Sequence, residues 1–195
     1  RQLLASDLLI ASDQPLPEIF LEEAKKRNLQ IANTVVFPSM ASSGAQSKLS
    51  SLKAVSASYP LRGTLQVNSV SQETTKSGPP PGSVWVDPAM LASLQADIGG
   101  QIKLGNSQFV IAGVITRELD RGAGFMNFAP RVMMSLDDLP ATGLLGLGSR
   151  VTYRLLLAGA DVDIQAYDQW ANSGIETQGL RGIRVETLEN AQPIM

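Results

Sequence analysis

Hydrophobic residues near the start of the chain follow the spacing of a strand, a helix and a second strand. Residues 8–11 form a short apolar run of the length typical of a buried strand. Between residues 16 and 24, apolar side chains recur three to four positions apart, which places them on one face of a helix. Pro17 suits the first turn of that helix, and Asn28 is a suitable stop. Residues 31–37 are apolar again and predict the second strand.

A segment of small side chains follows this first unit. Residues 39–51 are rich in serine, glycine and alanine, a composition that predicts a loop. Residues 52–59 alternate in the manner of a strand, which Pro60 ends, and residues 65–67 predict a short further pairing.

Three consecutive prolines divide the chain near its middle. Residues 69–82 are polar and end in Pro79-Pro80-Pro81-Gly82, a stiff connector whose proline nitrogens cannot donate hydrogen bonds. Beyond this boundary the pattern is mostly β. It predicts strands over residues 84–86 and 132–134, a short helix with Leu91, Leu94 and Ile98 on one face, and a hairpin of residues 101–104 and 109–115.

The strand–helix–strand pattern returns in the last third of the chain. Apolar side chains alternate from Val151 to Leu157, and a helix capped by Asp163 carries Ile164, Tyr167, Trp170 and Ala171 on one face. Residues 183–187 predict the last strand. Two such units can share one sheet with both helices on one face. The sequence therefore predicts an α+β fold in which a β-rich insert separates two strand–helix–strand units.

Composition excludes several kinds of chemistry. The 195 residues include no histidine and no cysteine, so a Ser-His-Asp or Cys-His nucleophile, an ordinary zinc site and a disulfide framework are absent. We therefore expect no enzyme, no metal and no cofactor. The net charge of −2 lacks the basic footprint of nucleic-acid binding. No apolar run reaches the roughly 18–20 residues that cross a bilayer.

The remaining polar motifs have structural explanations. The pairs Asp137-Asp138 and Asp161/Asp163 lie where turns or helices begin, and capping accounts for them. The glycines of residues 143–148 precede a strand and lack the spacing of a nucleotide-binding loop. A serine–lysine dyad that uses Lys48 or Lys53 stays formally open.

One loop combines glycines with large apolar side chains. Phe125, Met126 and Phe128 lie in the segment 122–128, beside Gly122 and Gly124. Loops usually run over the surface, where apolar side chains are unexpected. Two interpretations remain open: these residues pack into a core, or they form an apolar contact loop for a partner or a hydrophobic ligand.

Several sequence blocks resemble a known family. Leu52-Lys53-Ala54-Val55 followed by residues 59–63 (Tyr-Pro-Leu-Arg-Gly) resembles the extracytoplasmic domain of YbbP-like ABC transporter permeases. The blocks at residues 82–87, 91–92, 100–105 and 109–115 are similar to the wider MacB/FtsX/LolC pattern. Gln101 departs from it, since many members carry Asp there. The resemblance covers essentially the whole chain.

The resemblance implies a specific architecture. A discontinuous α/β lobe, the porter, is expected over residues 1–67 and 150–195, and an inserted, mostly β lobe, the sabre, over residues 78–147. Both ends would continue into membrane helices at the periplasmic face of the bacterial inner membrane. The implied partner is a cytoplasmic ATP-binding subunit, with periplasmic proteins or a hydrophobic substrate as further partners. The implied role is mechanotransmission, the coupling of ATP hydrolysis to extracytoplasmic substrate handling or partner activation.

Two other hypotheses come from different classes. The apolar loop would suit a periplasmic interaction module that docks a partner protein without transport. A carboxylate-dependent hydrolase would require Asp or Glu side chains clustered in a deep cleft.

Overall fold

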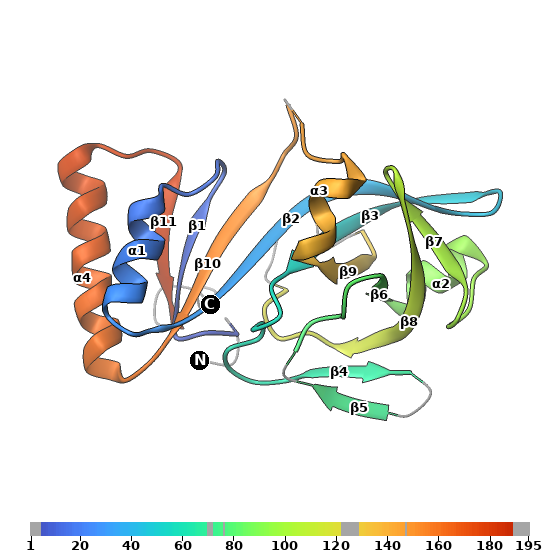
Figure 1. The fold of residues 1–195 in the computed structure, drawn as a ribbon, viewed down its shortest axis with the longest axis horizontal. Helices are drawn as coiled ribbons and strands as arrows, with labels where there is room; N and C mark the ends of the chain where they lie inside the picture. Colours follow the sequence, from blue (N-terminus) through green and yellow to red (C-terminus); the bar gives the residue numbers. More distant parts are fainter. Residues whose placement is uncertain (1–4, 70–71, 76, 122–128, 147, 189–195) are drawn as a thin grey trace, which may run out of the picture.

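The computed structural model describes residues 5–69, 72–75, 77–121, 129–146 and 148–188 (Figure 1). Helices and strands mix throughout, as the α+β prediction requires. The strands join in one pairing order, β11-β1-β10-β2-β3-β9-β6-β8-β4-β5, with β7 between β2 and β8. Two regions follow from this order: a helix-covered sheet at one end of the molecule, and a closed arrangement of strands at the other.

The helix-covered sheet contains both predicted strand–helix–strand units. The first comprises β1 (Leu8–Ser12), α1 (Glu18–Lys26) and β2 (Gln30–Ser43), and the second comprises β10 (Thr152–Ala158), α4 (Asp161–Gln178) and β11 (Ile183–Thr187). The four strands are antiparallel, and β1 lies between β10 and β11. Figure 1 shows α1 and α4 side by side on one face. Asn28 follows α1 with a left-handed φ of 57°, a conformation that asparagine tolerates.

Apolar side chains from both units fill the space between the helices and the sheet. Phe20 and Ala24 of α1 pack there with Ile164, Tyr167 and Ala171 of α4, together with Leu8, Ile10, Leu155 and Leu157. The buried Tyr167 hydroxyl donates a hydrogen bond to the Phe20 carbonyl at 2.7 Å. This bond joins the two helices directly. The start of α4 differs from the prediction: its N-cap residue is Ala160, and Asp161 and Asp163 both lie in its first turn.

Tyr167→Phe is expected to lower the free energy of unfolding by about 1 kcal/mol, because one net hydrogen bond is lost while the ring packing stays. Tyr153→Phe is the matched control, since no hydrogen bond of its hydroxyl occurs in the described residues. Urea unfolding of both variants measures the difference. Equal stability of the two variants would mean that the helix-to-helix bond contributes nothing.

The prediction of a loop over residues 39–51 is wrong. The segment forms a hairpin of β2 and β3 (Gln46–Val55), with its turn at Gly44, where φ is 56°. Ser39 lies opposite Ser50, and the buried Ser50 hydroxyl donates to the Ser39 carbonyl at 2.7 Å. Small side chains suit these strands because neighbouring strands pack closely around them. Composition alone gave no sign of that packing.

The hairpin closes a six-stranded barrel. Its other strands are β6 (Ser83–Val86), β7 (Gln101–Leu104), β8 (Ser107–Arg117) and β9 (Arg131–Ser135). The pairs run β2–β3, β3–β9, β9–β6, β6–β8, β8–β7 and β7–β2, which returns to the first strand. Closure leaves these strands few unpaired edges. A contiguous apolar cluster fills the interior; it includes Phe37, Leu52, Val84, Ile102, Leu104, Ile111, Val132 and Met134.

Short elements complete the barrel. From α2 (Pro88–Leu94), Met90 and Leu94 join the interior cluster, and Leu139 of α3 (Leu139–Thr142) does the same. A hairpin of β4 (Leu65–Asn68) and β5 (Gln72–Thr75) extends from β8. Strand β2 belongs to both regions, since it pairs with β10 in the sheet and with β3 and β7 in the barrel. The division of the chain at residues 67, 78, 147 and 150 stays a prediction.

Candidate functional site

The chain enters the sheet at the start of β1 and leaves it at the end of β11, and these two strand ends are neighbours. Leu8, the first residue of β1, lies opposite Thr187, the last residue of β11. Adjacent antiparallel strands place these residues about 4.5–5.5 Å apart at their Cα atoms. Segments beyond the two strands therefore start from neighbouring positions.

The predicted contact loop lies outside the described residues. This applies to Phe125, Met126 and Phe128. The structure describes the residues on either side of the segment 122–128. Among them, Arg121 and Arg131 take part in a buried network of charged side chains.

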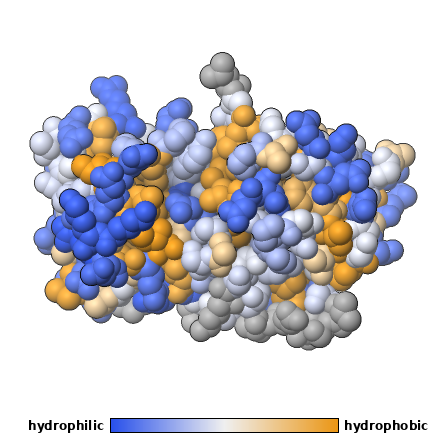
Figure 2. All heavy atoms as spheres, viewed as in Figure 1, coloured by the Kyte–Doolittle hydropathy of each residue, from blue (hydrophilic) through white to orange (hydrophobic). Residues whose placement is uncertain are grey.

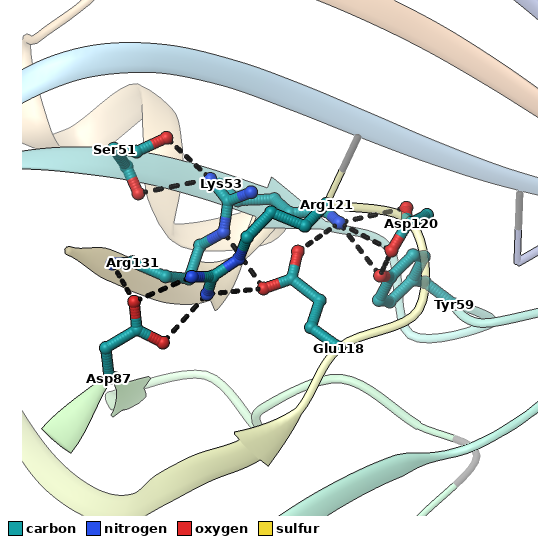
Figure 3. Close-up of polar contacts among 8 residues, drawn as sticks. All are labelled: Ser51, Lys53, Tyr59, Asp87, Glu118, Asp120, Arg121 and Arg131. Carbon is teal, nitrogen blue, oxygen red and sulfur yellow. Dashed lines mark hydrogen bonds and ion pairs between the residues drawn. The ribbon is translucent and has the colours of Figure 1, made fainter. Parts of the chain in front are cut away.

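Lys53 is the centre of this network. It stands on β3 between Leu52 and Ala54, whose side chains face the barrel interior, so its own side chain points outward from the barrel wall. It is nevertheless only 1% exposed. Its Nζ donates to Tyr59 Oη at 2.8 Å, to Glu118 Oε2 at 2.8 Å and to both carboxylate oxygens of Asp120 at 2.9 Å (Figure 3). The Tyr59 hydroxyl in turn donates to Asp120.

Arg131 and Arg121 extend the network towards β6. Arg131 Nε donates to Glu118 Oε1 at 3.0 Å, and its Nη1 donates to Ser51 Oγ at 2.6 Å. Arg121 forms a two-point contact with Asp87, at 2.7 and 3.0 Å, and also reaches Glu118 at 3.1 Å. The backbone N–H of Arg131 donates to Asp87 Oδ2 at 2.7 Å. Three cations thus alternate with three carboxylates.

The neighbouring charges decide the protonation of the network. Burial by itself would raise the pKa of Glu118, but Lys53 and Arg131 together hold it well below its usual range. Burial raises the pKa of Tyr59 well above its ordinary value, and the charges of Asp120 and Glu118 add to the effect. Glu118 is therefore a fixed anion and Tyr59 a fixed neutral donor.

This network stabilises the attachment of the β8–β9 connection, and its charged groups bond to one another. Glu118, Asp120 and Arg121 follow β8, and Arg131 begins β9, so the network attaches both ends of the β8–β9 connection to the barrel wall. Within the described residues the Nζ of Lys53 bonds to carboxylates and a phenol, with no serine among its partners. Lys48, the other lysine of the formal dyad, is exposed.

The carboxylate pairs singled out in the sequence occupy separate elements. Asp138 accepts a hydrogen bond from the Gly82 N–H at 2.8 Å beside α3, whereas Asp161 and Asp163 lie on α4. Among the described residues, no group of three or more Asp or Glu side chains could hold a metal ion.

A mainly apolar cleft separates α1 from the barrel end. It has a volume of about 240 Å³ and lies above the paired strands at Asn33–Val35 and Tyr153–Leu155. Its walls come from residues 15–18 and Leu21 on the α1 side and from Leu136 on the barrel side. Figure 2 shows apolar surface between the helix layer and the strands.

In the part of the chain that the structure describes, none of the helices combines the length and apolar character needed to cross a bilayer.

Comparisons with known proteins give a homologous permease and a shared fold. No family model matches the chain. Over 170 residues, 87% of its length, it is 35% identical to the ABC transporter permease YbbP of Escherichia coli K12, of which it spans 20%. Most of that relative therefore lies outside the comparison.

Solved structures share the fold at low sequence identity. The periplasmic region of MacB from Actinobacillus actinomycetemcomitans matches with a TM-score of 0.59 and 8% identity, over 97% of this chain and 92% of that one. The extracellular domain of the transporter YknZ from Gram-positive bacteria gives 0.61 and 11%, over 92% and 100%. A permease domain from Porphyromonas gingivalis gives 0.54 and 10%, over 98% and 94%. The chain is therefore homologous to one part of the permease YbbP, and it shares the fold of the periplasmic region of MacB and of the extracellular domain of YknZ.

Proposed function

We propose that this chain is the extracytoplasmic domain of an ABC transporter permease subunit and that it couples ATP hydrolysis in the cytoplasm to substrate handling or partner activation outside it. The partner is a cytoplasmic ATP-binding subunit, reached through membrane helices of the full-length protein. The helix-covered sheet falls within the porter segments, residues 1–67 and 150–195. Strands β6 to β9 of the barrel fall within the sabre segment, residues 78–147, whereas its strands β2 and β3 belong to the porter segment.

The observation that carries this proposal is the position of the two chain ends. The start of β1 and the end of β11 are neighbours at one edge of the sheet. A domain inserted between two membrane helices needs both ends on the side that faces the membrane, and neighbouring strand ends support this proposal. Movement of the two flanking helices would act directly on adjacent strands of one sheet.

The apolar cleft supplies a second argument. The cleft leaves a gap between α1 and the barrel end, whereas the buried charge network and the interior cluster hold the barrel itself together. Motion would therefore concentrate between the helix layer and the barrel instead of deforming either one.

Cross-linking across the cleft tests the coupling. Cysteines replace Glu18 on the α1 side and Leu136 on the barrel side of the full-length permease, in which any other cysteines have been substituted. This chain contributes none. With a short bifunctional maleimide, the ATPase rate of the reconstituted complex should fall by at least about fivefold, the lower end of ordinary coupling between sites.

The control links two positions of one helix. Glu18 and Glu22 lie one turn apart on α1, both exposed, so the same reagent joins them without bridging the cleft. This pair should retain the full ATPase rate. An unchanged rate in the cross-cleft pair, after complete cross-linking, would contradict the proposed coupling.

A further inference from the structure

One buried hydroxyl group lacks a partner. Within the described residues, Thr34 Oγ1 is the buried side-chain oxygen without a hydrogen bond, and Thr34 is only 1% exposed. A buried hydroxyl without a partner costs about 1–3 kcal/mol, so such groups call for an explanation. Thr34 belongs to β2, where it lies directly opposite Arg154 of β10.

Thr34 and Arg154 point to the same face of the sheet. Directly opposed residues of an antiparallel pair share a face, with their Cβ atoms about 4.5–5.5 Å apart. On each strand the alternate neighbours, Ala32 and Leu156, belong to the apolar cluster on the face away from α1 and α4. The guanidinium and the hydroxyl therefore start from adjacent positions on that helix-free face.

Arg154 carries a positive charge on this face that no described carboxylate contacts. Its side chain makes no hydrogen bond or ion pair within the described residues. Burial lowers its pKa, while the charges of Asp120 and Glu186 act against that effect and those of Arg184 and Arg131 add to it. A partly buried guanidinium without a partner is costly, in the same way as the Thr34 hydroxyl.

The two nearby carboxylates are already committed. Asp120 accepts both Lys53 and the Tyr59 hydroxyl, and Glu186 pairs with Arg184 at 2.7 Å. The three cations of the buried network face its three carboxylates, so within the described residues the charge of Arg154 has no carboxylate of its own. Two donors without acceptors, side by side on one face, fit an anion from outside the described part of the chain.

We propose that Arg154 and Thr34 form a binding subsite for one carboxylate group of a ligand. A planar carboxylate matches the fork of N–H donors on a guanidinium, and its second oxygen can accept the Thr34 hydroxyl. The negative charges of Asp120 and Glu186 disfavour a dianion such as inorganic phosphate. The proposal does not depend on the transporter role.

Titration with sodium acetate tests the subsite on the 195-residue chain. Two-dimensional NMR follows the Arg154 Nε–H and the Thr34 amide, with sodium chloride at matched ionic strength as the reference. Both signals should shift and saturate, with a Kd on the order of 1 mM. Inorganic phosphate should bind more weakly. Shifts that do not exceed those in chloride, or tighter binding of phosphate than of acetate, would overturn the proposal.

Three variants separate binding from folding. Arg154→Met should abolish the saturating shift, and Thr34→Val should weaken acetate binding by about tenfold. Both should melt no lower than the parent chain without acetate, since each removes an unsatisfied buried group. Arg184→Met is the control, since Arg184 is 64% exposed and already paired, and it should bind acetate normally. Unchanged acetate binding by Arg154→Met would contradict the assignment.

Discussion

Replacing Lys53 with methionine is expected to lower the free energy of unfolding by about 3–5 kcal/mol. Methionine fills nearly the same space, so packing changes little, but the charge at the centre of the network disappears. Asp120, 7% exposed, would then keep the Tyr59 hydroxyl as its one remaining partner in the network. Glu118, 2% exposed, would lose one of its cations. Removing one partner of a buried pair is costly because the other charge stays buried.

Two further variants test whether the loss of stability comes from the buried charge network. Lys48→Met lies on the same strand at an exposed position, and it should change the stability by less than about 0.5 kcal/mol. Adding Asp120→Asn to Lys53→Met should restore part of the loss, since the uncompensated carboxylate is then neutral. Urea unfolding measures all three. A Lys53→Met variant as stable as Lys48→Met would show that the network does not stabilise the fold.

The helices were predictable because their signals are local. The apolar face of α1 and that of α4 recur every three to four residues, and this spacing needs no knowledge of the rest of the chain. Tyr167 and Phe20 were each placed on an apolar face for this reason. The hydrogen bond between them joins residues 147 positions apart, and no local pattern indicates it.

The barrel could not be predicted from single segments. Its closure depends on β7, a strand of four residues that pairs with β2 some sixty positions earlier. The β2–β3 hairpin was missed for a related reason. Serine and alanine are poor strand signals by themselves, yet Ala41 and Ser50 are fully buried where strands pack closely, and tertiary packing overrides propensity.

The charge network left one sign in the sequence. Lys53 interrupts an apolar stretch, Leu52 to Val55, in which its neighbours are buried, and a lysine at such a position requires a buried counter-charge. The charged run of residues 117–121 supplies it, more than sixty positions later. The position of Lys53 in the sequence indicates the need for a partner but not which carboxylate provides it.

Glu118→Gln is expected to lower the free energy of unfolding at pH 7 by about 3–5 kcal/mol. It should also remove the loss of stability at acid pH that protonation of Glu118 causes in the parent chain. The folded-state pKa of Glu118 is held below its usual range, whereas in the unfolded chain it is about 4.3. Ionised Glu118 therefore contributes its full share to the free energy of unfolding above pH 4.3, and this share is lost as the pH falls towards the folded-state pKa. Over that interval the parent chain should lose about 1.4 kcal/mol per pH unit relative to the variant.

Urea unfolding at pH 7, 5, 4 and 3 measures this difference directly. The stability gap between the parent chain and Glu118→Gln should be constant from pH 7 to 5 and should narrow below pH 4. Glu22→Gln, on the exposed side of α1, should follow the parent chain at every pH. A gap that stays constant down to pH 3 would mean that Glu118 keeps its usual pKa in the folded state. In that case the network would still attach the β8–β9 connection to the barrel wall, but it would not lower the pKa of Glu118.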